Sequence, residues 1–497
     1  MYRINKDTET TSHLEHSTPE NMNTTNDPKT ENSMQQDLFT AEDADVNFRS
    51  LTWQGAAILI AKLQIGLGAL SLPSTFHVLG FVPGILCFLF LSCMTTVAGY
   101  VSGNARQYYP HIHSISDAAE MILGKGAREV MGAIYYTYLT LVAGAGLLTT
   151  SVGLNALSDH GACTQLFVGV TCIAAFIFGT AFRSLEKVSW LSWAGVAGII
   201  VAIWITAIAC LAQDRPADAP STPNTSINLD IHIFPQTDFA KAMSAISSQL
   251  FAVGASGTFF SVSAEMKKSE LFTRALICGQ SFIVATCIAI ASIVYGKVGQ
   301  YLSSPALGSA GLLIKKIAYG IAFPGLVITA ILWSHVAAKY WFVRILRGTH
   351  HLQSNTITHW VTWVGSMAVT VAIAFVIVGV IPFFDEFLSL VGALVNPVFT
   401  AIFPGLMILF FIAMKPTRVH DNPGIEKRAY PIREWLPLAL RKWKDGSKEM
   451  VALYGAILMI IVGVYIIVGG TYATVLNVKL SYDEGKVSGM FSCEDNS

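Results

Sequence analysis

The sequence predicts an all-α polytopic membrane protein with 11 transmembrane helices, built as two five-helix halves in an inverted repeat plus one further helix. Three observations support this fold class. Of the 497 residues, 53% are hydrophobic and 13% are charged, and the mean hydropathy is +0.53. The apolar residues form successive runs of the roughly 20 residues that cross a bilayer core. The first and the sixth run are interrupted by glycines and polar residues at corresponding positions, which is typical of inverted repeats.

Residues 1–50 differ in composition from the rest of the chain. They are rich in Ser, Thr, Asn, Asp and Glu and poor in aromatic residues, so they bury too little apolar surface to offset the entropy of the chain. We expect a disordered N-terminal tail. Because no charged block followed by an apolar block opens the tail, no cleavable signal peptide is predicted, and the first span directs the chain to the membrane.

The apolar runs that follow define a membrane domain over residues 51–475. The individual spans are expected at 54–76, 80–102, 129–154, 164–182, 188–212, 239–263, 274–298, 317–341, 359–381, 385–413 and 451–475. Spans 1–5 thus occupy residues 54–212, spans 6–10 occupy 239–413, and span 11 occupies 451–475.

The distribution of basic residues predicts the orientation. Lys and Arg are concentrated in the N-terminal tail and in every second connection, which places these segments in the cytoplasm. With 11 spans, the C-terminal tail at 476–497 is then extracytoplasmic. One of the basic connections holds the amphipathic stretch Ser116–Leu123, which predicts a short helix lying against the inner face.

Several function classes are not supported by the sequence. The formal net charge is zero, so nucleic acid is not an expected partner. The eight cysteines contain no C-x-x-C pair, and neither a disulfide framework nor a zinc site is predicted. No span carries a nucleophile motif, a metal-binding motif or paired acids, so we expect no enzyme, metal or cofactor. A channel would show a repeated pore element or a charged ring.

The first span contains an unusual stretch from Lys62 to Pro73, which reads Lys-Leu-Gln-Ile-Gly-Leu-Gly-Ala-Leu-Ser-Leu-Pro. A helix breaks at membrane depth only where protein or a wet cavity satisfies the freed backbone groups. Gly66 and Gly68 allow the helix to unwind and a ligand to approach the backbone, and Pro73 removes one more N–H donor. We therefore expect a binding site at membrane depth.

The sixth span repeats this pattern. The stretch from Phe251 to Phe260 places Gly254, Ser256, Gly257 and Thr258 in the middle of an apolar helix. One such span alone is explained as well by close packing of small residues between helices. Two interrupted spans in corresponding positions favour a substrate site near the midplane, between the two breaks.

Lys62 is the ionisable residue that we expect to act in ion coupling. It lies roughly 13 Å along the first span, near the middle of a core about 30 Å thick. Charges at this depth are costly and usually face a wet pathway or a partner; the alternative is a lysine that extends to the cytoplasmic surface. Thr329 and Ser334 in the eighth span are further candidates for the ion path, although hydrogen bonds between helices would explain them equally well.

These motifs resemble those of the amino acid/auxin permease family, within the amino acid-polyamine-organocation superfamily, and in particular fungal neutral amino acid permeases. The resemblance covers about residues 50–475 and rests on the stretches 66–73 and 254–258 and on Glu265-Met266 with its following basic residues. It implies a LeuT-like fold and secondary transport of amino acids. Many sodium-coupled relatives carry an asparagine at the position of Lys62, so the lysine argues against sodium coupling.

An amino acid zwitterion matches the exposed ends of interrupted helices, because a helix N-terminus offers N–H groups and a C-terminus offers carbonyls. We assign the carboxylate to the amides of residues 66–69, and the ammonium to carbonyls near residue 65 and at 251–254. Tyr138 would place a hydroxyl nearby, although a tyrosine of the membrane interface is an equal explanation. The expected substrate-binding residues are Ile65, Gly66, Leu67, Gly68, Ala69, Tyr138, Phe251, Gly254 and Ser256.

We therefore expect a secondary active transporter that imports neutral aliphatic and aromatic L-amino acids together with protons by alternating access. Small and apolar residues surround the second break, with no acid beside them to recruit a cationic side chain. A non-transporting amino acid sensor of the same fold is the alternative. We place the protein in the plasma membrane, with the vacuolar membrane as the second choice.

Overall fold

The computed structural model describes residues 51–65, 68–109, 112–181, 185–220, 227–235, 237–352, 354–381, 383–415, 430–442, 446–483 and 490–493. The expected N-terminal tail lies outside them. Within the described residues the chain is helical, apart from turns and one isolated β-bridge. Ten helical segments are long and apolar enough to cross a membrane, or 11 if the bent pair at residues 53–79 is one span. The predicted all-α multi-span fold is confirmed.

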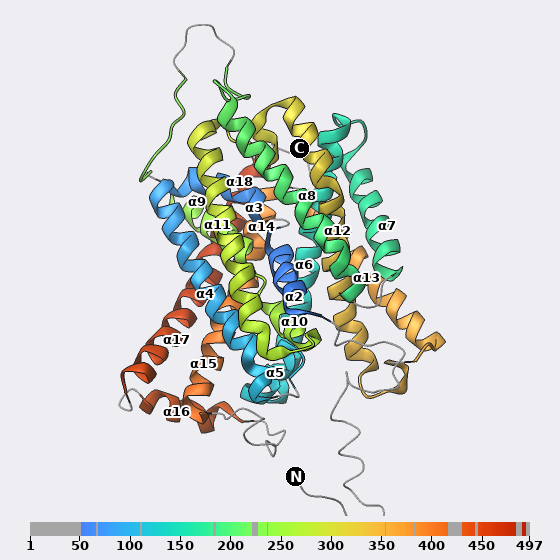
Figure 1. Cartoon of the computed structure of the whole chain (residues 1–497), viewed down its shortest axis with the longest axis vertical. Coiled ribbons are helices and arrows are strands. Elements are labelled where there is room, and N and C mark those ends of the chain that lie inside the picture. Colours follow the sequence, from blue (N-terminus) through green and yellow to red (C-terminus); the bar gives the residue numbers. More distant parts are fainter. Residues whose placement is uncertain are drawn as a thin grey trace, which may run out of the picture.

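The helices follow the order expected for two halves plus an addition (Figure 1). The first half comprises α2 (Trp53–Ile65), α3 (Gly68–Leu79), α4 (Phe81–Tyr108), α5 (Ile115–Leu123), α6 (Lys125–Ser158), α7 (Thr164–Ala181) and α8 (Leu185–Ala212). The second comprises α9 (Phe239–Val253), the 3₁₀ turn η1 (Ser256–Thr258), α10 (Phe259–Glu265), α11 (Phe272–Val298), α12 (Leu312–Leu346), α13 (Ile357–Val380), α14 (Phe384–Leu394), the π-helical turn η6 (Val398–Ile402) and α15 (Phe403–Met414). The remaining helices are α16 (Ile432–Arg441) and the run α17 (Ser447–Tyr465), η8 (Ile466–Gly470) and α18 (Thr471–Asp483).

Within the described part of the two halves, three spans are interrupted. The axes of α2 and α3 are inclined by 48° across residues 66 and 67, which lie outside the described residues. The sixth span changes from α9 to the 3₁₀ turn η1 across Gly254 and Ala255 before α10 begins. A third interruption lies between α14 and α15, where Asn396 and Pro397 precede the π-helical turn η6. The breaks in the first and sixth spans fall where the glycine-rich stretches predict them.

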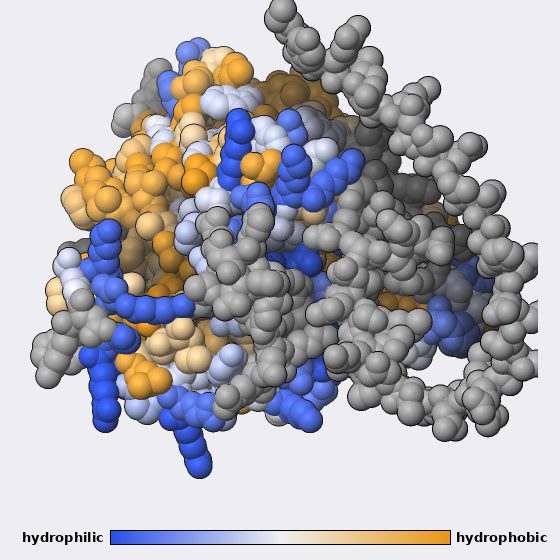
Figure 2. Space-filling model, turned by 60° about the horizontal axis from the view of Figure 1, so that its bottom comes forward, coloured by the Kyte–Doolittle hydropathy of each residue, from blue (hydrophilic) through white to orange (hydrophobic). Residues whose placement is uncertain are grey.

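One end of the helix bundle is rich in hydrophilic side chains. We call the end that holds α5 and α16 the α5 end; the first described residues lie there too, and the last lie at the opposite end (Figure 1). Hydrophilic side chains gather over the α5 end, while hydrophobic residues cover the flank beside it (Figure 2). The predicted short helix is present as α5, and Ser114 and Asp117 form its capping box. Such a cap satisfies N–H groups at the start of the helix.

The bundle has buried central helices and a lipid-type outer surface. In the most apolar part of α6, 94% of the residues are buried, against 28% in the α17–α18 run. α12 packs along both α6 and α8. Large apolar side chains on the outer helices, such as Ile173, Val369 and Ile461, are more than half exposed. A surface of this kind faces acyl chains rather than water.

Two half-helices are joined at the α5 end by backbone hydrogen bonds. The Leu51 N–H donates to the carbonyl of Glu265 at 3.1 Å, and the Lys267 N–H donates to the carbonyl of Leu51 at 2.9 Å. Leu51 lies just before α2, and Glu265 is the last residue of α10. The start of the first span is therefore fastened to the end of the sixth.

The C-terminal segment is fastened to the opposite end. Cys163, in the connection before α7, forms a disulfide with Cys493. The expectation that the cysteines form no disulfide is wrong for this pair, because 330 residues separate them and only the fold brings them together. Phe491 lies beside the end of α13, where its N–H donates to the carbonyl of Gly379 at 2.7 Å.

The last helical run extends past residue 475, where the apolar stretch ends. Polar side chains hold α18 against its neighbours: the Ser481 hydroxyl donates to Glu386 Oε1 at 2.9 Å. The Tyr482 hydroxyl donates to the carbonyl of Val380 at 2.7 Å. These contacts keep the chain helical to Asp483, beyond the segment that hydropathy alone marks as a span.

Candidate functional site

The two interrupted spans of the repeat meet in the interior of the bundle. Gly68, the first residue of α3, lies against α9; a Cβ atom at Gly68 would be 2.2 Å from the Cα atom of Ala252. Such a distance is impossible for real atoms, so only glycine allows this approach. Gly66 and Leu67 lie outside the described residues, whereas Ile65 and Ala69 on either side of them are buried.

The backbone groups at the end of α9 have partners from other helices. The Gly254 N–H turns back to the carbonyl of Phe251 at 3.2 Å. The carbonyl of Gly254 accepts a hydrogen bond from the Tyr138 hydroxyl at 2.6 Å. The carbonyl of Leu250 accepts one from Asn396 Nδ2 at 2.9 Å. Side chains of α6 and of the third break thus replace the hydrogen bonds that the interrupted helix lacks.

Aromatic side chains enclose this meeting point. The ring of Tyr138 lies 5.2 Å from that of Phe399 and 6.0 Å from that of Trp333, between ring centroids. The Ser256 hydroxyl donates to the carbonyl of Phe399 at 2.9 Å, which joins the sixth span to the π-helical turn η6. The expected residues Gly68, Phe251, Gly254, Ser256 and Tyr138 therefore belong to one buried cluster.

Lys62 lies apart from this cluster, between α2, α8 and α12. Its side chain is fully buried, and its ammonium donates to the carbonyl of Gly325 on α12 at 2.8 Å. The ammonium also lies 3.3 Å from where a Cβ of Gly195 on α8 would be. The side chain does not extend to the cytoplasmic surface, the alternative considered above.

Of the two other residues expected on the ion path, one lies beside Lys62. The Thr329 hydroxyl donates at 2.7 Å to the same Gly325 carbonyl that receives Lys62. Ser334 is buried further along α12, and its hydroxyl has no hydrogen-bond partner among the described residues. The structure thus brings Lys62 and Thr329 together on one carbonyl.

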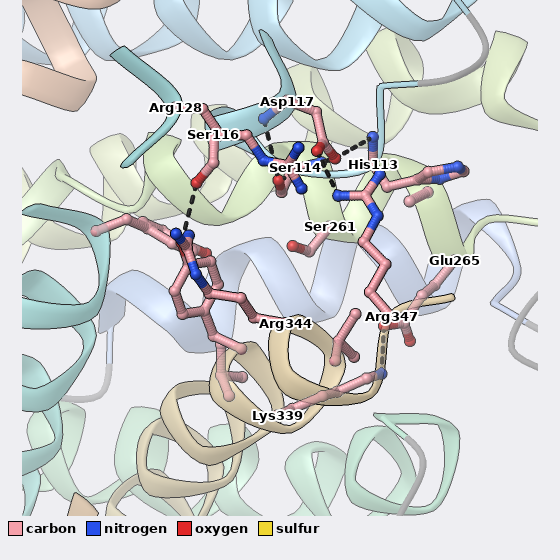
Figure 3. Close-up of a pocket in the computed structure, with 15 residues that line it drawn as sticks. His113, Ser114, Ser116, Asp117, Arg128, Ser261, Glu265, Lys339, Arg344 and Arg347 are labelled. Atoms are coloured by element: carbon pink, nitrogen blue, oxygen red, sulfur yellow. Dashed lines mark hydrogen bonds and ion pairs between the residues drawn. The ribbon is translucent and has the colours of Figure 1, made fainter. Parts of the chain in front are cut away.

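A cavity of about 120 Å³ lies at the α5 end, between α5, α6, α10 and α12 (Figure 3). Three cations at the end of α12 border it, two on the helix and one, Arg347, directly after it, and each pairs with an acid on a different helix. Lys339 pairs with Glu265 of α10 at 2.8 Å, Arg347 pairs with Asp117 of α5 at 2.7 Å, and Arg344 pairs with Glu129 of α6. These ion pairs hold α12 to three neighbouring elements around the cavity.

Asp117 is the acid of this group that lies outside the membrane spans. Burial alone would raise the pKa of its carboxyl, but the neighbouring Arg347 guanidinium, together with His113 and the Ser114 hydroxyl, holds the pKa below its ordinary value. Asp117 therefore stays ionised at neutral pH and keeps its pair with Arg347.

Tyr135 separates the cavity from the broken spans. It lines the cavity, and its ring lies 5.6 Å from that of Phe399 and 6.4 Å from that of Tyr138. On the cavity side, its ring lies 5.3 Å from that of Tyr340. A molecule that moved from the breaks to the α5 end would have to displace these rings.

Sequence patterns alone did not reveal several residues of this site. Asn396 stands before Pro397 in the sequence, a pair that favours a helix kink, but its contact with Leu250 depends on tertiary packing. Gly325 and Phe399 contribute carbonyls, for which a sequence has no signal. The basic residues of α12 are visible as a cationic helix end, but their acidic partners are not.

A helical membrane protein with interrupted spans facing each other in its interior has the architecture of a secondary transporter. The model of the transmembrane amino acid transporter protein family matches residues 49–422, so the chain belongs to this family. The predicted family is thereby confirmed, and the protein is a transmembrane amino acid transporter. The family is one of membrane transporters.

Similar proteins are known from filamentous fungi. The chain is 31% identical over 469 residues to a transmembrane transporter of Gibberella moniliformis, covering 94% of this chain and 92% of the relative. It is 27% identical over 459 residues to the N amino acid transport system protein of Neurospora crassa, covering 91% and 90%.

A solved structure shows the same fold. Mhp1, a nucleobase-cation-symport-1 family transporter in a closed conformation with bromovinylhydantoin bound, matches with a TM-score of 0.50. The match covers 92% of this chain and 98% of Mhp1, at 14% sequence identity. At this identity the likeness concerns the fold alone, and it agrees with the predicted LeuT-like arrangement.

Proposed function

We propose that this protein imports neutral amino acids together with protons, by alternating access between the two ends of the bundle. Two observations carry the proposal: the two interrupted spans meet at Gly68 and Ala252, and the buried Lys62 ammonium of the first span is bonded to a carbonyl of α12. The first feature supports a zwitterionic substrate, and the second supports a proton as the coupling ion.

The breaks offer the two kinds of group that an amino acid needs. The N-terminus of α3 presents the amides of Gly68 and Ala69 and the positive end of a helix dipole, which suit a carboxylate. The C-terminus of α9 presents carbonyls, and the Tyr138 hydroxyl already contacts one of them at Gly254. When a carboxylate binds, this hydroxyl can turn to donate to it instead.

The surroundings of the breaks support a neutral side chain on the substrate. Tyr138, Trp333 and Phe399 form an aromatic wall around the cluster. Aromatic and aliphatic amino acids would bury apolar surface against this wall.

Lys62 supplies a positive charge between α2 and α12 that a separate sodium ion would otherwise supply. Its hydrogen bond to the Gly325 carbonyl links the first span to α12. Binding or loss of one proton adds or removes this charge, and thereby changes the link between the helices. A single charge that moves through 100 mV yields about 2.3 kcal/mol, enough for roughly fifty-fold accumulation.

The α5 end would be the cytoplasmic end, where substrate leaves through the cavity beside Lys339 and Arg347. The Lys and Arg side chains at this end, among them Arg128, Lys339 and Arg347, support the orientation (Figure 3). The Cys163–Cys493 disulfide at the opposite end supports it as well, because disulfides persist on the oxidising side of a membrane. We place the transporter in the plasma membrane.

The test is uptake of radiolabelled amino acids in a transport-deficient cell, scanned over substrates, pH and sodium, with wild type, Lys62→Ala and Lys62→Asn compared. We expect wild-type accumulation of neutral amino acids that rises at acidic external pH and does not depend on sodium. Currents that follow sodium rather than pH would refute the coupling. Binding of amino acids to purified protein in vesicles without accumulation would refute transport and identify a sensor.

A further inference from the structure

We propose that Asn396 binds the ammonium group of the substrate through its side-chain oxygen, and so distinguishes amino acids from other carboxylic acids. The inference rests on the proposed function. It adds a residue from the interruption between α14 and α15, outside the two glycine-rich spans. It starts from a buried amide that lies directly against the break in the sixth span.

Asn396 is held in one orientation by the interrupted helix. The residue is fully buried, between the end of α14 and the π-helical turn η6. Its Nδ2 donates to the carbonyl of Leu250 at 2.9 Å. If α9 continued, the Gly254 N–H would donate to this carbonyl. In the structure the Gly254 N–H donates to the Phe251 carbonyl instead. The Asn396 Nδ2 group therefore takes the place of the missing helical donor to the Leu250 carbonyl.

The side-chain oxygen of Asn396 has no corresponding role in the break. Asn396 Oδ1 is buried and has no hydrogen-bond partner among the described residues. A buried acceptor without a donor costs free energy, so such groups usually mark a place where a water or ligand binds. Because Nδ2 is fixed on Leu250, the amide cannot turn its oxygen toward another donor without losing that bond.

The free oxygen lies at the glycine of the second break. A Cβ atom at Gly254 would be 1.7 Å from Asn396 Nδ2 and 2.5 Å from Oδ1. Glycine at this position thus leaves room for the amide. The carbonyls of Phe251 and Gly254, expected from the sequence to receive the ammonium, already accept hydrogen bonds from Gly254 N–H and the Tyr138 hydroxyl. Asn396 Oδ1, by contrast, has no hydrogen-bond partner among the described residues.

The chemistry of the group fits an ammonium. An ammonium carries donors and no acceptor, so it needs oxygen atoms around it. A neutral amide oxygen with no hydrogen-bond partner among the described residues supplies one. Hydrogen bonds to a charged group are stronger than those between neutral groups, so a substrate without the ammonium should lose affinity here.

The experiment compares amino acids with the same acids lacking the amino group. Inhibition constants are measured against radiolabelled uptake for L-phenylalanine and L-leucine, and for 3-phenylpropionate and 4-methylpentanoate, in wild type, Asn396→Ala and Asn396→Asp. We expect Asn396→Ala to weaken both amino acids about tenfold or more and the deaminated acids less than twofold. Asn396→Asp keeps the acceptor but loses the donor to Leu250, so it should stay within about threefold of wild type for the amino acids.

A matched control removes another buried asparagine. Asn155 in α6 is fully buried, and its Nδ2 donates to Thr164 at 2.8 Å near the opposite end of the bundle. Asn155→Ala should lower thermal stability without changing the preference for amino acids over deaminated acids. Surface amounts and detergent-solubilised size profiles are measured for every variant, and binding to purified protein is measured by thermal shift for any variant that does not reach the surface.

The possible failures are distinguishable. Wild-type protein that takes up neither amino acid would overturn the proposed function. A second result is normal wild-type uptake together with an Asn396→Ala variant in which the affinities for amino acids and for deaminated acids fall alike or do not change. This result would overturn only the role of Asn396. An Asn396→Asp variant as impaired as Asn396→Ala would show that the residue serves through its donor to Leu250 and would also overturn the inference.

Discussion

The approach of Gly68 to Ala252 gives the sharpest prediction, because its geometry is known at atomic distance. In Gly68→Ala, the added methyl would lie 2.2 Å from the Ala252 Cα and 2.5 Å from its Cβ. Carbon atoms pack at about 3.5–4.0 Å, so α3 and α9 must separate by more than about 1 Å. Overpacking of this kind costs about 1–3 kcal/mol, which corresponds to about 5- to 150-fold in an equilibrium constant.

We expect Gly68→Ala to lower the initial rate of amino acid uptake about tenfold or more, because the substitution forces apart the two helix ends that must close around a substrate. The assay is radiolabelled uptake normalised to the amount of protein at the surface. Gly169→Ala on α7 is the matched control, since a Cβ there has nothing within 4 Å and should leave uptake unchanged. If Gly68→Ala transports as well as this control, the two breaks do not close on the substrate.

Three further predictions concern other parts of the molecule. Lys62→Met should abolish the pH dependence of uptake while exchange of amino acids across the membrane persists; a retained pH dependence would exclude Lys62 as the coupling residue. Glu265→Gln removes one partner of a largely buried ion pair, which should cost about 3 kcal/mol and lower the melting temperature; the exchange Glu265→Lys with Lys339→Glu should restore it. Peptide mapping without reductant should recover Cys163 linked to Cys493, and Cys163→Ser should lower thermal stability by the same amount as reduction of wild type; intact thiols at both positions would refute the link.

The helical breaks could be predicted from the sequence because their cause is local. Glycines and polar residues inside an apolar run destabilise a continuous helix wherever the chain places them. The breaks therefore appear between the end of α2 at Ile65 and the start of α3 at Gly68, and at Gly254, as the pattern indicates. The same holds for α5, whose cap residues Ser114 and Asp117 are neighbours in the chain.

The partners of the site residues could not be predicted, because they depend on which helices become neighbours. Lys62 was recognisable as an unusual charge, but its acceptor is a carbonyl on α12, 263 residues away. The distances from Tyr138 to Gly254 and from Asn396 to Leu250 are also long in sequence. A kink signal at Asn396 says nothing about the direction of its side chain.

The disulfide and the cavity illustrate the same limit at the two ends of the bundle. Nothing near Cys163 in the chain distinguishes it from the other cysteines, and its partner belongs to the last described segment. The acids around the cavity come from α5, α6 and α10, and each faces a cation of α12 only after the helices have assembled.

The backbone ladder between Leu51 and the end of α10 has a mechanical consequence. Because the amide and the carbonyl of Leu51 both hydrogen-bond to residues 265–267, α2 cannot tilt at this end without pulling α10 along. Any rearrangement that separated α2 from α10 at this end would have to break both hydrogen bonds, so one half-helix from each half of the chain is coupled here to its counterpart.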